Sequence, residues 1–398
     1  MRIALDIRAL QIDVQYRGIS TYIRELLIQF LKRRRELYLI AWPELDIELD
    51  KELLSAYKVL ELPRQSSWPL AKHLGYKRDG AKLKESYEEI AKNVDLFYFP
   101  STQDLRYGFP WEDIGVPRVV MVHSLMSVTN PELIPHCDFL GRHLTRWTHS
   151  AYAQHLVDCD GIITNSQYTE RSIRTVIKGQ LPGIRSILLG ISDDYVLPYV
   201  SQVDEYRLQR KLPPRFVLHV GGLFGNKNVE ALLQATAPRC DWPFVFAGTY
   251  SEEEQRYLAG KYSSQQIIWL GYVPREELPK LYAAASVFAY PSLLEGFGLP
   301  VLEAMAVGTP VVCSNASSLP EVVGNSAVMF NPKNLSEIRN AIYMVMQDEN
   351  VRMQMRTRGL ERAQHLSWRR TADTTWMTFE EIAENYNKRR KKSRMTGG

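Results

Sequence analysis

The chain has 398 residues, which is too long for one ordinary hydrophobic core and suits two α/β domains. Hydrophobic residues make up 45% and charged residues 24%, a balance that is typical of globular proteins and excludes a disordered chain. The formal net charge of +4 is small for this length, so the composition does not favour a nucleic-acid-binding protein. A modest basic excess is compatible with anionic small molecules or an acidic membrane surface.

Cysteine usage and the amino-terminal segment indicate the cellular compartment. Cys137, Cys159, Cys240 and Cys313 lie far apart and form neither a C-x-x-C pair nor a zinc-binding spacing, which predicts small buried side chains in a reducing compartment. Residues 1–6 meet a charge too early for a signal peptide, and no run approaches the ~18 apolar residues of a membrane span. We therefore expect a cytoplasmic protein.

The first half of the chain alternates strand and helix patterns. Apolar, partly β-branched runs predict strands at residues 2–7, 38–42, 95–99, 118–123 and 161–164. Apolar positions at helical spacing predict helices at residues 18–31, 82–92, 141–157 and 167–177. Such alternation is typical of a parallel sheet covered by helices on both faces, so we expect a Rossmann-like domain over residues 1–192.

The second half repeats this organisation after a polar, proline-containing segment, residues 193–213, which we interpret as a linker. Strands are predicted at residues 216–220, 244–247, 267–270 and 285–290, with helices at 229–237, 252–259 and 276–285. A second Rossmann-like domain over residues 214–366 follows from this pattern, then a C-terminal helix over 367–387 and a disordered basic tail over 388–398. Ligands of such sheets bind beyond the carboxyl ends of the strands, here in a cleft between two domains.

The most informative segment follows the last predicted strand and reads Ser292-Leu-Leu-Glu295-Gly296-Phe297-Gly298-Leu299-Pro-Val-Leu-Glu303. A chain that leaves a buried strand, turns on glycines and enters a helix presents backbone N–H groups and the positive end of the helix dipole, which suits a phosphate. Because an acid beside an anion site would repel phosphate, we expect Glu295 and Glu303 to accept hydrogen bonds from sugar and ribose hydroxyls. An ordinary surface loop before a helix shows the same residues, so this segment alone leaves both interpretations open.

With the strand that begins Gly308-Thr-Pro-Val-Val and the turn Ser317-Ser-Leu-Pro-Glu321, this segment resembles the nucleotide-sugar-dependent retaining glycosyltransferases of the GT-B fold. That family includes bacterial mannosyl- and glucosyltransferases and glycogen synthases, and the close match covers residues 216–332. The resemblance implies that Glu295 contacts the donor sugar and that Glu303 binds the ribose. It also implies that the amides of residues 296–299 contact the sugar and the diphosphate.

A second glycine turn, Gly221-Gly222-Leu-Phe-Gly-Asn-Lys227, follows a predicted strand and opens a helix. Its glycines allow close approach to a pyrophosphate, and Lys227 is expected to neutralise the leaving diphosphate. Taken alone, the turn is more typical of a plain loop. Many relatives carry arginine where Gly222 and Asn226 stand, so charge at the diphosphate rests mainly on Lys227.

Three further segments resemble sites of the family. His123 follows an apolar strand, where relatives place a histidine near the donor sugar and the acceptor; a histidine that merely caps the strand end is the alternative. Arg17 and Gly18 resemble the helix start that lies beside donor and acceptor, and they also suit an ordinary N-capped helix. Val273, in Gly271-Tyr-Val, resembles the loop that holds the nucleobase through backbone groups, although a simple strand-to-helix turn fits equally well.

Two charge patterns favour structural interpretations. Asp158-Cys-Asp160 matches the D-x-D metal motif of another glycosyltransferase fold, but it lies at a helix end without matching surroundings, so we expect a solvated turn, no metal and no other cofactor. The basic runs at 32–35 and 388–394 are expected to be solvated. If the acceptor is lipid-linked, they would instead favour peripheral association with the inner face of the membrane.

The sequence thus predicts a retaining hexosyltransferase of the GT-B fold, with Glu295, His123 and Lys227 as catalytic residues. GDP-mannose is the leading donor, and the acceptor is a glycan, a lipid-linked sugar or a small molecule in glycan, glycolipid or polysaccharide biosynthesis. No nucleic-acid partner is expected. A transferase that uses UDP-glucose or another UDP sugar, a phosphorylase or epimerase, and a non-catalytic sugar-nucleotide-binding subunit are the alternatives.

Overall fold

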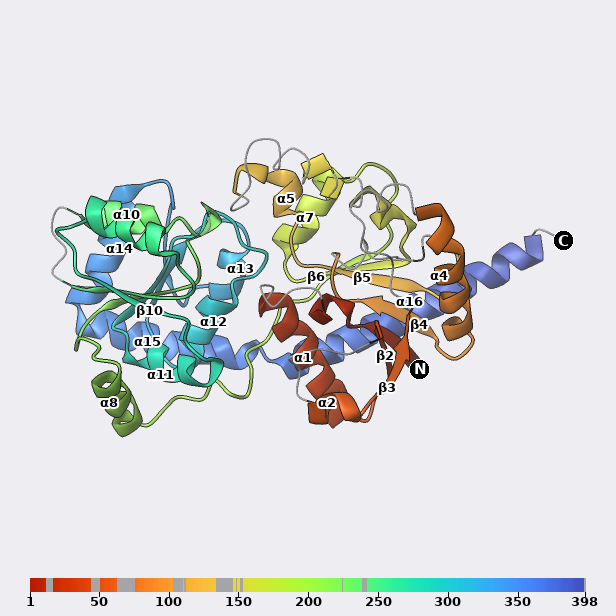
Figure 1. Ribbon diagram of the computed structural model, residues 1–398, viewed down its shortest axis with the longest axis horizontal. Coiled ribbons are helices and arrows are strands. Elements are labelled where there is room, and N and C mark those ends of the chain that lie inside the picture. The colour runs from red at the N-terminus through yellow and green to blue at the C-terminus, as the bar shows by residue number, and fades with distance from the viewer. Residues whose placement is uncertain are drawn as a thin grey trace. The chain divides into compact units, whose positions relative to one another are not determined.

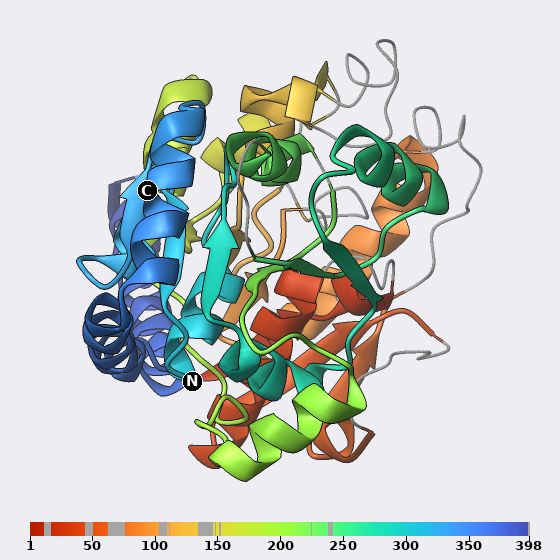
Figure 2. The ribbon, with the colours of Figure 1, turned by 90° about the vertical axis from the view of Figure 1, so that its left-hand side faces the viewer.

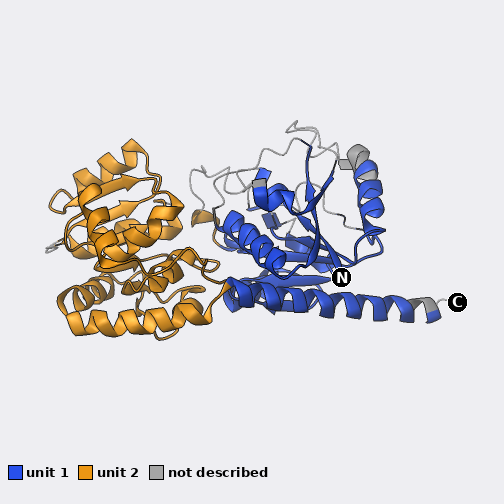
Figure 3. Cartoon of the chain, turned by 90° about the horizontal axis from the view of Figure 1, so that it is seen from below, with its two compact units in different colours: residues 1–129, 144–188, 368–398 blue, residues 130–143, 189–367 orange. Residues whose placement is uncertain are grey.

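The computed structural model describes residues 1–11, 17–43, 51–62, 76–102, 110, 112–133, 146–147, 149–150, 153–223, 225–237 and 242–396. The chain forms two compact units (Figure 3). Unit 1 comprises Met1–Thr129, Leu144–Leu188 and Trp368–Gly398, and unit 2 comprises Asn130–His143 and Leu189–Ser367. The chain therefore leaves unit 1 twice, after Thr129 and after Leu188, and returns to it at Leu144 and at Trp368.

Unit 1 is built on a seven-stranded parallel sheet in the order β3-β2-β1-β4-β5-β6-β7 (Figure 1). Its strands are β1 (Arg2–Asp6), β2 (Glu36–Ala41), β3 (Lys58–Glu61), β4 (Leu96–Phe99), β5 (Arg118–Val122), β6 (Gly161–Thr164) and β7 (Ile184–Ser186). All five strands predicted in this half are confirmed. The short strands β3 and β7 were not predicted because they are only partly buried and lack a long apolar run.

Helices cover both faces of the unit 1 sheet. They are α1 (Arg17–Lys32), α2 (Lys51–Ser55), α4 (Tyr76–Ala91), α5 (Met126–Thr129), α7 (Gln167–Val176) and α16 (Trp368–Thr396), with 3-10 turns η1 (Arg8–Gln11) and η4 (His155–Asp158). On one face α1 packs against α16, where the rings of Phe30 and Trp376 lie 5.5 Å apart. On the other face, α4 and α7 bury Tyr87 and Ile173 in the core.

The last helix, α16, differs from the sequence prediction because it continues to Thr396 and does not end near residue 387. Contacts within the basic segment explain the extra turns: Arg390 donates to the Gly115 carbonyl at 2.6 Å, and Lys388 pairs with Glu384 at 2.7 Å. The basic run at residues 32–35 also contacts α16. Arg33 forms an ion pair with Asp373, and the Arg35 guanidinium lies 4.5 Å from the centroid of the Trp376 ring.

Unit 2 is built on a six-stranded parallel sheet in the order β10-β9-β8-β11-β12-β13. Its strands are β8 (Val217–Val220), β9 (Phe244–Ala247), β10 (Ile267–Gly271), β11 (Val287–Tyr290), β12 (Val311–Ser314) and β13 (Val328–Phe330). With two parallel sheets of this kind, the predicted GT-B architecture of two Rossmann-like domains is confirmed.

Helices lie on both sides of the unit 2 strands (Figure 2). They are η3 (Pro131–Leu133), α8 (Val200–Gln209), η5 (Gly225–Lys227), α9 (Val229–Thr236), α10 (Glu252–Lys261), η6 (Arg275–Glu277), α11 (Leu278–Ala284), α12 (Leu299–Ala306), α13 (Leu319–Val323), α14 (Leu335–Gln347) and α15 (Glu349–His365). Helix α8 falls within the predicted linker. It folds because Val203 and Tyr206 are buried and Arg207 donates to the Ala284 carbonyl of α11 at 2.8 Å.

Some predictions fall wholly or partly outside the described residues. Cys137 and Cys240 lie outside them, whereas Cys159 and Cys313 are described and are buried free thiols. Eight of the 17 residues of the helix predicted at 141–157 also lie outside the described residues. Among the described helices, none combines the length and the apolar character needed to cross a bilayer.

Candidate functional site

The two glycine-containing segments predicted to hold the donor meet at the topological switch point of unit 2. Strands β8 and β11 are neighbours, and the sheet order runs outward from them in opposite directions. The turn with Gly222 and Lys227 follows β8, and the loop with Glu295 follows β11. Because crossovers diverge at such a point, a crevice forms at the strand ends there, which is where open parallel sheets bind ligands.

Lys227 and Glu295 form an ion pair at this point. Lys227 Nζ lies 2.7 Å from Glu295 Oε1, and it also donates to the Tyr290 hydroxyl at 2.7 Å. Ser292 donates to the same Glu295 oxygen at 2.6 Å. The Lys227 and Glu295 side chains are 17% and 13% exposed, so each reaches solvent with a small part of its surface.

The charge state of Lys227 follows from these neighbours. Burial disfavours its charged form, but the Glu295 carboxylate and the Tyr290 hydroxyl outweigh burial and raise the pKa of Lys227 above its usual range. Burial and the Glu295 carboxylate raise the pKa of Tyr290, which stays protonated. The cluster therefore presents one firmly held cation beside one carboxylate.

Two serines and an asparagine hold the loop that carries Glu295. Ser317 Oγ accepts from the Glu295 amide at 2.9 Å, and Ser318 Oγ donates to the carbonyls of Glu295 and Phe297 at 3.0 and 2.9 Å. From the other side, buried Asn226 donates to the Leu294 carbonyl at 3.1 Å. Asn226 therefore holds the backbone of this loop in place.

Helix α12 begins at the end of this loop. Its N-cap, Gly298, has φ +106°, and a Cβ added there would lie 2.5 Å from Leu319 Cδ2, so only glycine fits. A glycine N-cap followed by Leu299 and Pro300 leaves the helix start without a capping side chain. The positive end of the helix dipole lies directly after Gly296 and Phe297, as the sequence predicts.

Glu303 lies within α12 among tyrosines. Its Oε2 accepts from the Tyr282 hydroxyl at 2.9 Å. Burial raises the pKa of Glu303, while hydrogen bonds from Tyr282 and Tyr195 and the charge of Arg275 act in the opposite direction. Phenolic hydroxyls thus orient the carboxylate, and the Glu303 residue as a whole is half-buried.

The remaining donor residues of unit 2 lie in the loops that follow β8 and β10. Gly222 is partly exposed in the turn after β8. Val273 is buried in the loop between β10 and η6, next to Gly271, whose φ is +65°. Arg275, at the start of η6, acts to lower the pKa of Glu303 through its charge. The segment expected at the nucleobase therefore lies close to the residue expected at the ribose.

The predicted residues of unit 1 gather at the carboxyl ends of its strands. His123 follows β5, and its Nε2 lies 2.8 Å from the Pro100 carbonyl. Because a carbonyl only accepts, Nε2 carries the proton and Nδ1 carries the lone pair. Burial lowers the pKa of His123 to about 4, although the Pro100 carbonyl favours the charged form. At neutral pH, His123 is therefore a hydrogen-bond acceptor through Nδ1.

Arg17 and Gly18 begin α1, which contributes Tyr22 to the same edge. The Tyr22 and His123 rings meet edge-on with centroids 5.0 Å apart, and Tyr22 shares a 2.5 Å hydrogen bond with Tyr98 of β4. Gly18 is exposed, and among the described residues no heavy atom outside its own helix backbone and chain neighbours lies within 4 Å of a Cβ placed there. The backbone at the start of α1 is thus open to a ligand.

Both aspartates of the D-x-D sequence interact with side chains of unit 1. Arg118 Nε donates to Asp160 Oδ2 at 3.2 Å, and His155 Nδ1 lies 2.9 Å from Asp158 Oδ2. In the described part of the chain, no three histidine, cysteine, aspartate or glutamate side chains cluster as metal ligands would.

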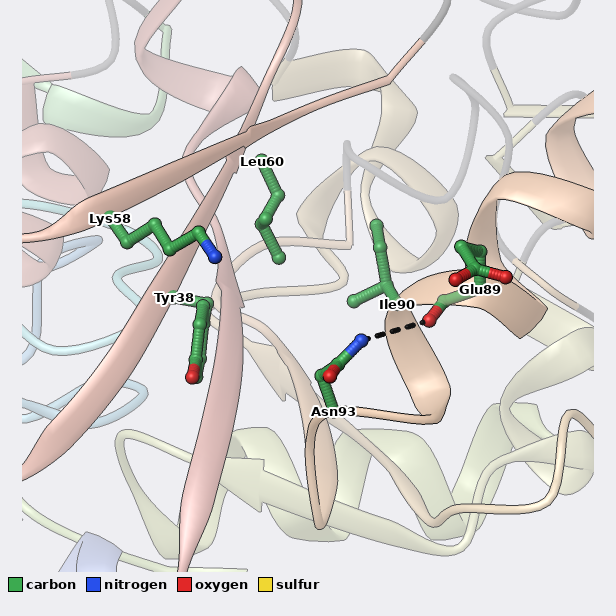
Figure 4. A pocket seen from close by; sticks show the side chains of 6 residues that line it. All are labelled: Tyr38, Lys58, Leu60, Glu89, Ile90 and Asn93. Atoms are coloured by element: carbon green, nitrogen blue, oxygen red, sulfur yellow. Dashed lines mark hydrogen bonds between the residues drawn. The ribbon is translucent and has the colours of Figure 1, made fainter.

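One pocket of unit 1 lies apart from His123. Lys58 at the start of β3 and Asn93 before β4 place it toward the amino ends of the strands, whereas His123 follows the carboxyl end of β5. Figure 4 shows these side chains and the 3.4 Å hydrogen bond from Asn93 to the Glu89 carbonyl. The residues that line it are Tyr38, Lys58, Leu60, Glu89, Ile90 and Asn93.

Comparison with known proteins places this geometry in a family. Residues 202–362 match the model of glycosyl transferases group 1. The O-antigen chain mannosyltransferase B of Escherichia coli is 30% identical over 328 residues, which are 79% of this chain and 77% of that protein. The chain belongs to the group 1 glycosyltransferases. This glycosyltransferase is also 27% identical over 304 residues to the serotype-specific mannosyltransferase WbdA of E. coli, a match that covers 73% of the chain and 37% of WbdA.

Solved structures agree on the fold. A sucrose-phosphate synthase from Thermosynechococcus elongatus matches with a TM-score of 0.74 and 22% identity, over 96% of this chain and 99% of the other. HepE from Anabaena, solved in complex with UDP and glucose, matches with a TM-score of 0.71 and 19% identity, over 96% of this chain and 100% of the other. The predicted family and GT-B fold are therefore confirmed.

The structure brings the predicted residues Lys227 and Glu295 together, whereas the hydroxyl side chains that contact the predicted glutamates were not predicted. Tyr290 and Ser292 flank Glu295, and both lie within the strand and motif that were singled out. Tyr282 and Tyr195 act on Glu303 from segments that were taken as core helix and linker. A polar hydroxyl at the carboxyl end of a strand was the available signal for Tyr290; nothing in the sequence indicated Tyr195.

Proposed function

We propose that this glycosyltransferase transfers a hexose, with GDP-mannose as the leading donor, from a nucleoside diphosphate sugar to an acceptor hydroxyl in polysaccharide biosynthesis. The transfer would retain the anomeric configuration and need no metal ion. The observation that carries the proposal is the Lys227–Glu295 pair at the β8–β11 switch point, beside the uncapped start of α12. The names of the mannosyltransferase relatives support the choice of donor.

The proposed transfer reaction follows from the charges and hydrogen-bonding groups described above. The bond between the anomeric carbon and the diphosphate breaks, and Lys227 with the α12 amides stabilises the departing negative charge. Glu295 accepts hydrogen bonds from sugar hydroxyls, and the Nδ1 lone pair of His123 accepts another. The acceptor oxygen bonds to the anomeric carbon from the same face, and its proton passes to the departing phosphate oxygen. Glu303 holds the ribose, and the backbone around Val273 holds the base.

A donor panel tests the proposal. The purified chain is heated with GDP-mannose, UDP-glucose and other sugar nucleotides, and the donor that raises the melting temperature is then supplied with acceptor sugars after chelation of metals. We expect GDP-mannose to stabilise the protein, and the product, followed by NMR, to keep the α configuration. Stabilisation by UDP sugars alone would identify the alternative donor class. Binding without transfer or slow hydrolysis would identify a non-catalytic subunit.

The acceptor class is proposed from the relatives and from charge. The relative's name refers to an O-antigen chain, which favours a growing glycan as the acceptor, and we propose that this glycan is lipid-linked. The exposed basic residues of α16, Lys388 and Arg389 among them, would then favour peripheral contact with an anionic membrane surface. Flotation with anionic and with neutral vesicles distinguishes this from a fully soluble acceptor.

A further inference from the structure

A buried histidine lies beside the glycine turn that follows β8, and the reaction proposed above gives it no role. His219 belongs to β8 and is fully buried. Its Nδ1 lies 3.1 Å from the Ala289 carbonyl of β11, and its ring stacks on Tyr290 with centroids 5.8 Å apart. Its Nε2 has no hydrogen-bond partner among the described residues. An unpartnered buried polar atom is costly, so it calls for a function.

The hydrogen bond at Nδ1 fixes the tautomer. A carbonyl only accepts, so Nδ1 carries the proton and the neutral ring has a lone pair at Nε2. In that form Nε2 is unable to donate to a phosphate oxygen, which is itself only an acceptor. A second proton on Nε2 would turn the ring into a cation that donates from both nitrogens.

Nε2 faces the glycine turn that is proposed to hold the diphosphate. Gly221 has φ +143°, and a Cβ placed on it would lie 3.4 Å from His219 Nε2 and 3.9 Å from Lys227 Cε, the two atoms within 4 Å among the described residues. The space that the glycine leaves free is therefore bounded by an imidazole and by the side chain of the site's lysine. A group that enters this space meets both.

We propose that His219 takes up a proton from solvent when the donor diphosphate binds, and that its Nε2–H then donates to a phosphate oxygen. This inference rests on the proposed function. It supplies a second positive charge beside the diphosphate, where Gly222 and Asn226 bring none. Lys227 gives one cation from η5 and His219 gives the other from β8.

The groups around His219 support a change of charge on binding. Lys227 faces it from η5, with Glu295 paired to that lysine; Tyr290 faces it from β11; and Tyr250, after β9, donates to the Gly221 carbonyl at 2.6 Å. Without ligand, burial and then the Lys227 charge lower the pKa of His219 to about 4, although the Ala289 carbonyl favours the charged form. A bound diphosphate brings negative charge to the same place and opposes both effects.

Proton uptake is measured by titration calorimetry of the full chain with GDP-mannose and UDP-glucose between pH 5.5 and 8, in buffers of different ionisation enthalpy. Sugar nucleotides are used because their esterified phosphates do not titrate in this range. For wild type we expect uptake of up to one proton per site, and affinity that falls by up to about tenfold per pH unit before it levels off.

Three variants make the result specific. His219→Asn keeps a donor for the Ala289 carbonyl and lacks the Nε2 position, so it should bind weakly and without a pH-dependent step. His219→Gln offers a donor that does not titrate, so it should bind more tightly than His219→Asn and without proton uptake. His365→Asn, at the exposed end of α15, is the matched control and should behave as wild type.

The outcomes separate the two proposals. Proton uptake that is equal in wild type and His219→Asn, or absent in a wild type that binds donor, overturns the role of His219 and leaves the proposed function intact. Absence of binding to every sugar nucleotide overturns both. Circular dichroism of each variant checks that the fold is kept.

Discussion

At the scale of single residues, the Lys227–Glu295 pair is the electrostatic centre of unit 2. Both side chains are more than four-fifths buried, and each satisfies the other's charge. A buried charge that loses its partner is strongly destabilising, whereas removal of both charges is often tolerated. Under the proposed function, the pair links stability to activity, because the donor diphosphate would compete with Glu295 for the ammonium group of Lys227.

Replacing Lys227 by methionine should separate these two effects. Lys227→Met leaves Glu295 without its cation, and we expect a loss of about 3 kcal/mol in the free energy of unfolding and at least ~100-fold in turnover. The double variant Lys227→Met with Glu295→Gln should recover most of the stability and none of the activity. Recovery of activity in the double variant would show that the lysine acts only through folding. Urea unfolding and donor turnover are the two measurements.

The two glutamates should give different kinetic effects. Glu303→Ala removes a carboxylate held by Tyr282 and is expected to weaken nucleotide binding about tenfold, which corresponds to about 1.4 kcal/mol. Glu295→Ala removes a sugar contact and should mainly lower the turnover number. Nucleotide affinity by calorimetry and turnover at saturating donor check this division. Wild-type kinetics in both variants would refute both roles.

Acid should destabilise unit 2 through His219. Its pKa is near 4 in the fold against an ordinary value of 6.5, so the unfolded chain binds more protons between these values. Stability is therefore lost as pH falls from 6.5 towards 4, and a step from pH 7 to pH 5 should cost about 2 kcal/mol at this one residue. Urea unfolding without ligand measures the step, which should shrink in His219→Asn. An equal step in both proteins would assign the loss to other groups.

At the scale of elements, the start of α12 depends on one backbone conformation. Gly298→Ala forces an alanine to φ +106° and against Leu319, so we expect a loss of roughly 1–3 kcal/mol together with weaker donor binding. Gly260→Ala is the matched control, because Gly260 lies in helix α10 with open space around it and should gain about 0.5–1 kcal/mol. Equal effects of the two changes would contradict this account.

The elements also show how far sequence reasoning reached. Buried parallel strands such as β5 and β11 were predictable because their apolar runs have no other explanation. Helix α8 and the end of α16 were not, since α8 has few apolar positions and the terminal turns of α16 depend on contacts with distant residues, such as Arg390 with Gly115. The local sequence pattern therefore predicts a helix or strand when burial of its own apolar residues is enough to form it, and fails when contacts with distant residues are needed.

The same distinction applies to the candidate site. Lys227 and Glu295 are 68 positions apart, and only the order of the strands brings them to within 2.7 Å. Their residue types and motifs were visible in the sequence, and the roles that the resemblance implies for them stay predictions. The hydrogen bonds of Ser317 and Ser318 to the Glu295 loop were not, because the sequence shows that a turn exists and says nothing about what it holds.

At the scale of the whole molecule, α16 completes the core of unit 1 from the far end of the chain. Buried Phe379 packs its ring 4.7 Å from Tyr98, and a Cβ on Gly161 would lie 2.3 Å from Ile382 Cδ1. The face of the unit 1 sheet that α16 covers is therefore completed by a helix that follows residues 189–367 of unit 2 in the chain.

Phe379→Ala should consequently destabilise one unit and spare the other. A large buried aromatic side chain replaced by alanine costs about 3–5 kcal/mol, here in unit 1. We expect an earlier unfolding transition for unit 1, while a stabilising sugar nucleotide still raises the transition of unit 2. Differential scanning calorimetry with and without donor checks this. A loss of the ligand effect would show that the two units do not unfold separately.

The segment of unit 2 that runs from residue 189 to residue 367 begins and ends at one backbone contact, which bears on how such proteins diversify. The Ile191 amide donates to the Leu366 carbonyl at 2.8 Å, and Ile191 bridges Ser367, so residues 189–367 start and finish at the same spot. A segment with adjoining ends can be exchanged as a cassette between relatives. If unit 2 binds the donor as proposed, recombination at this seam would change the donor preference and leave most of unit 1 as it is.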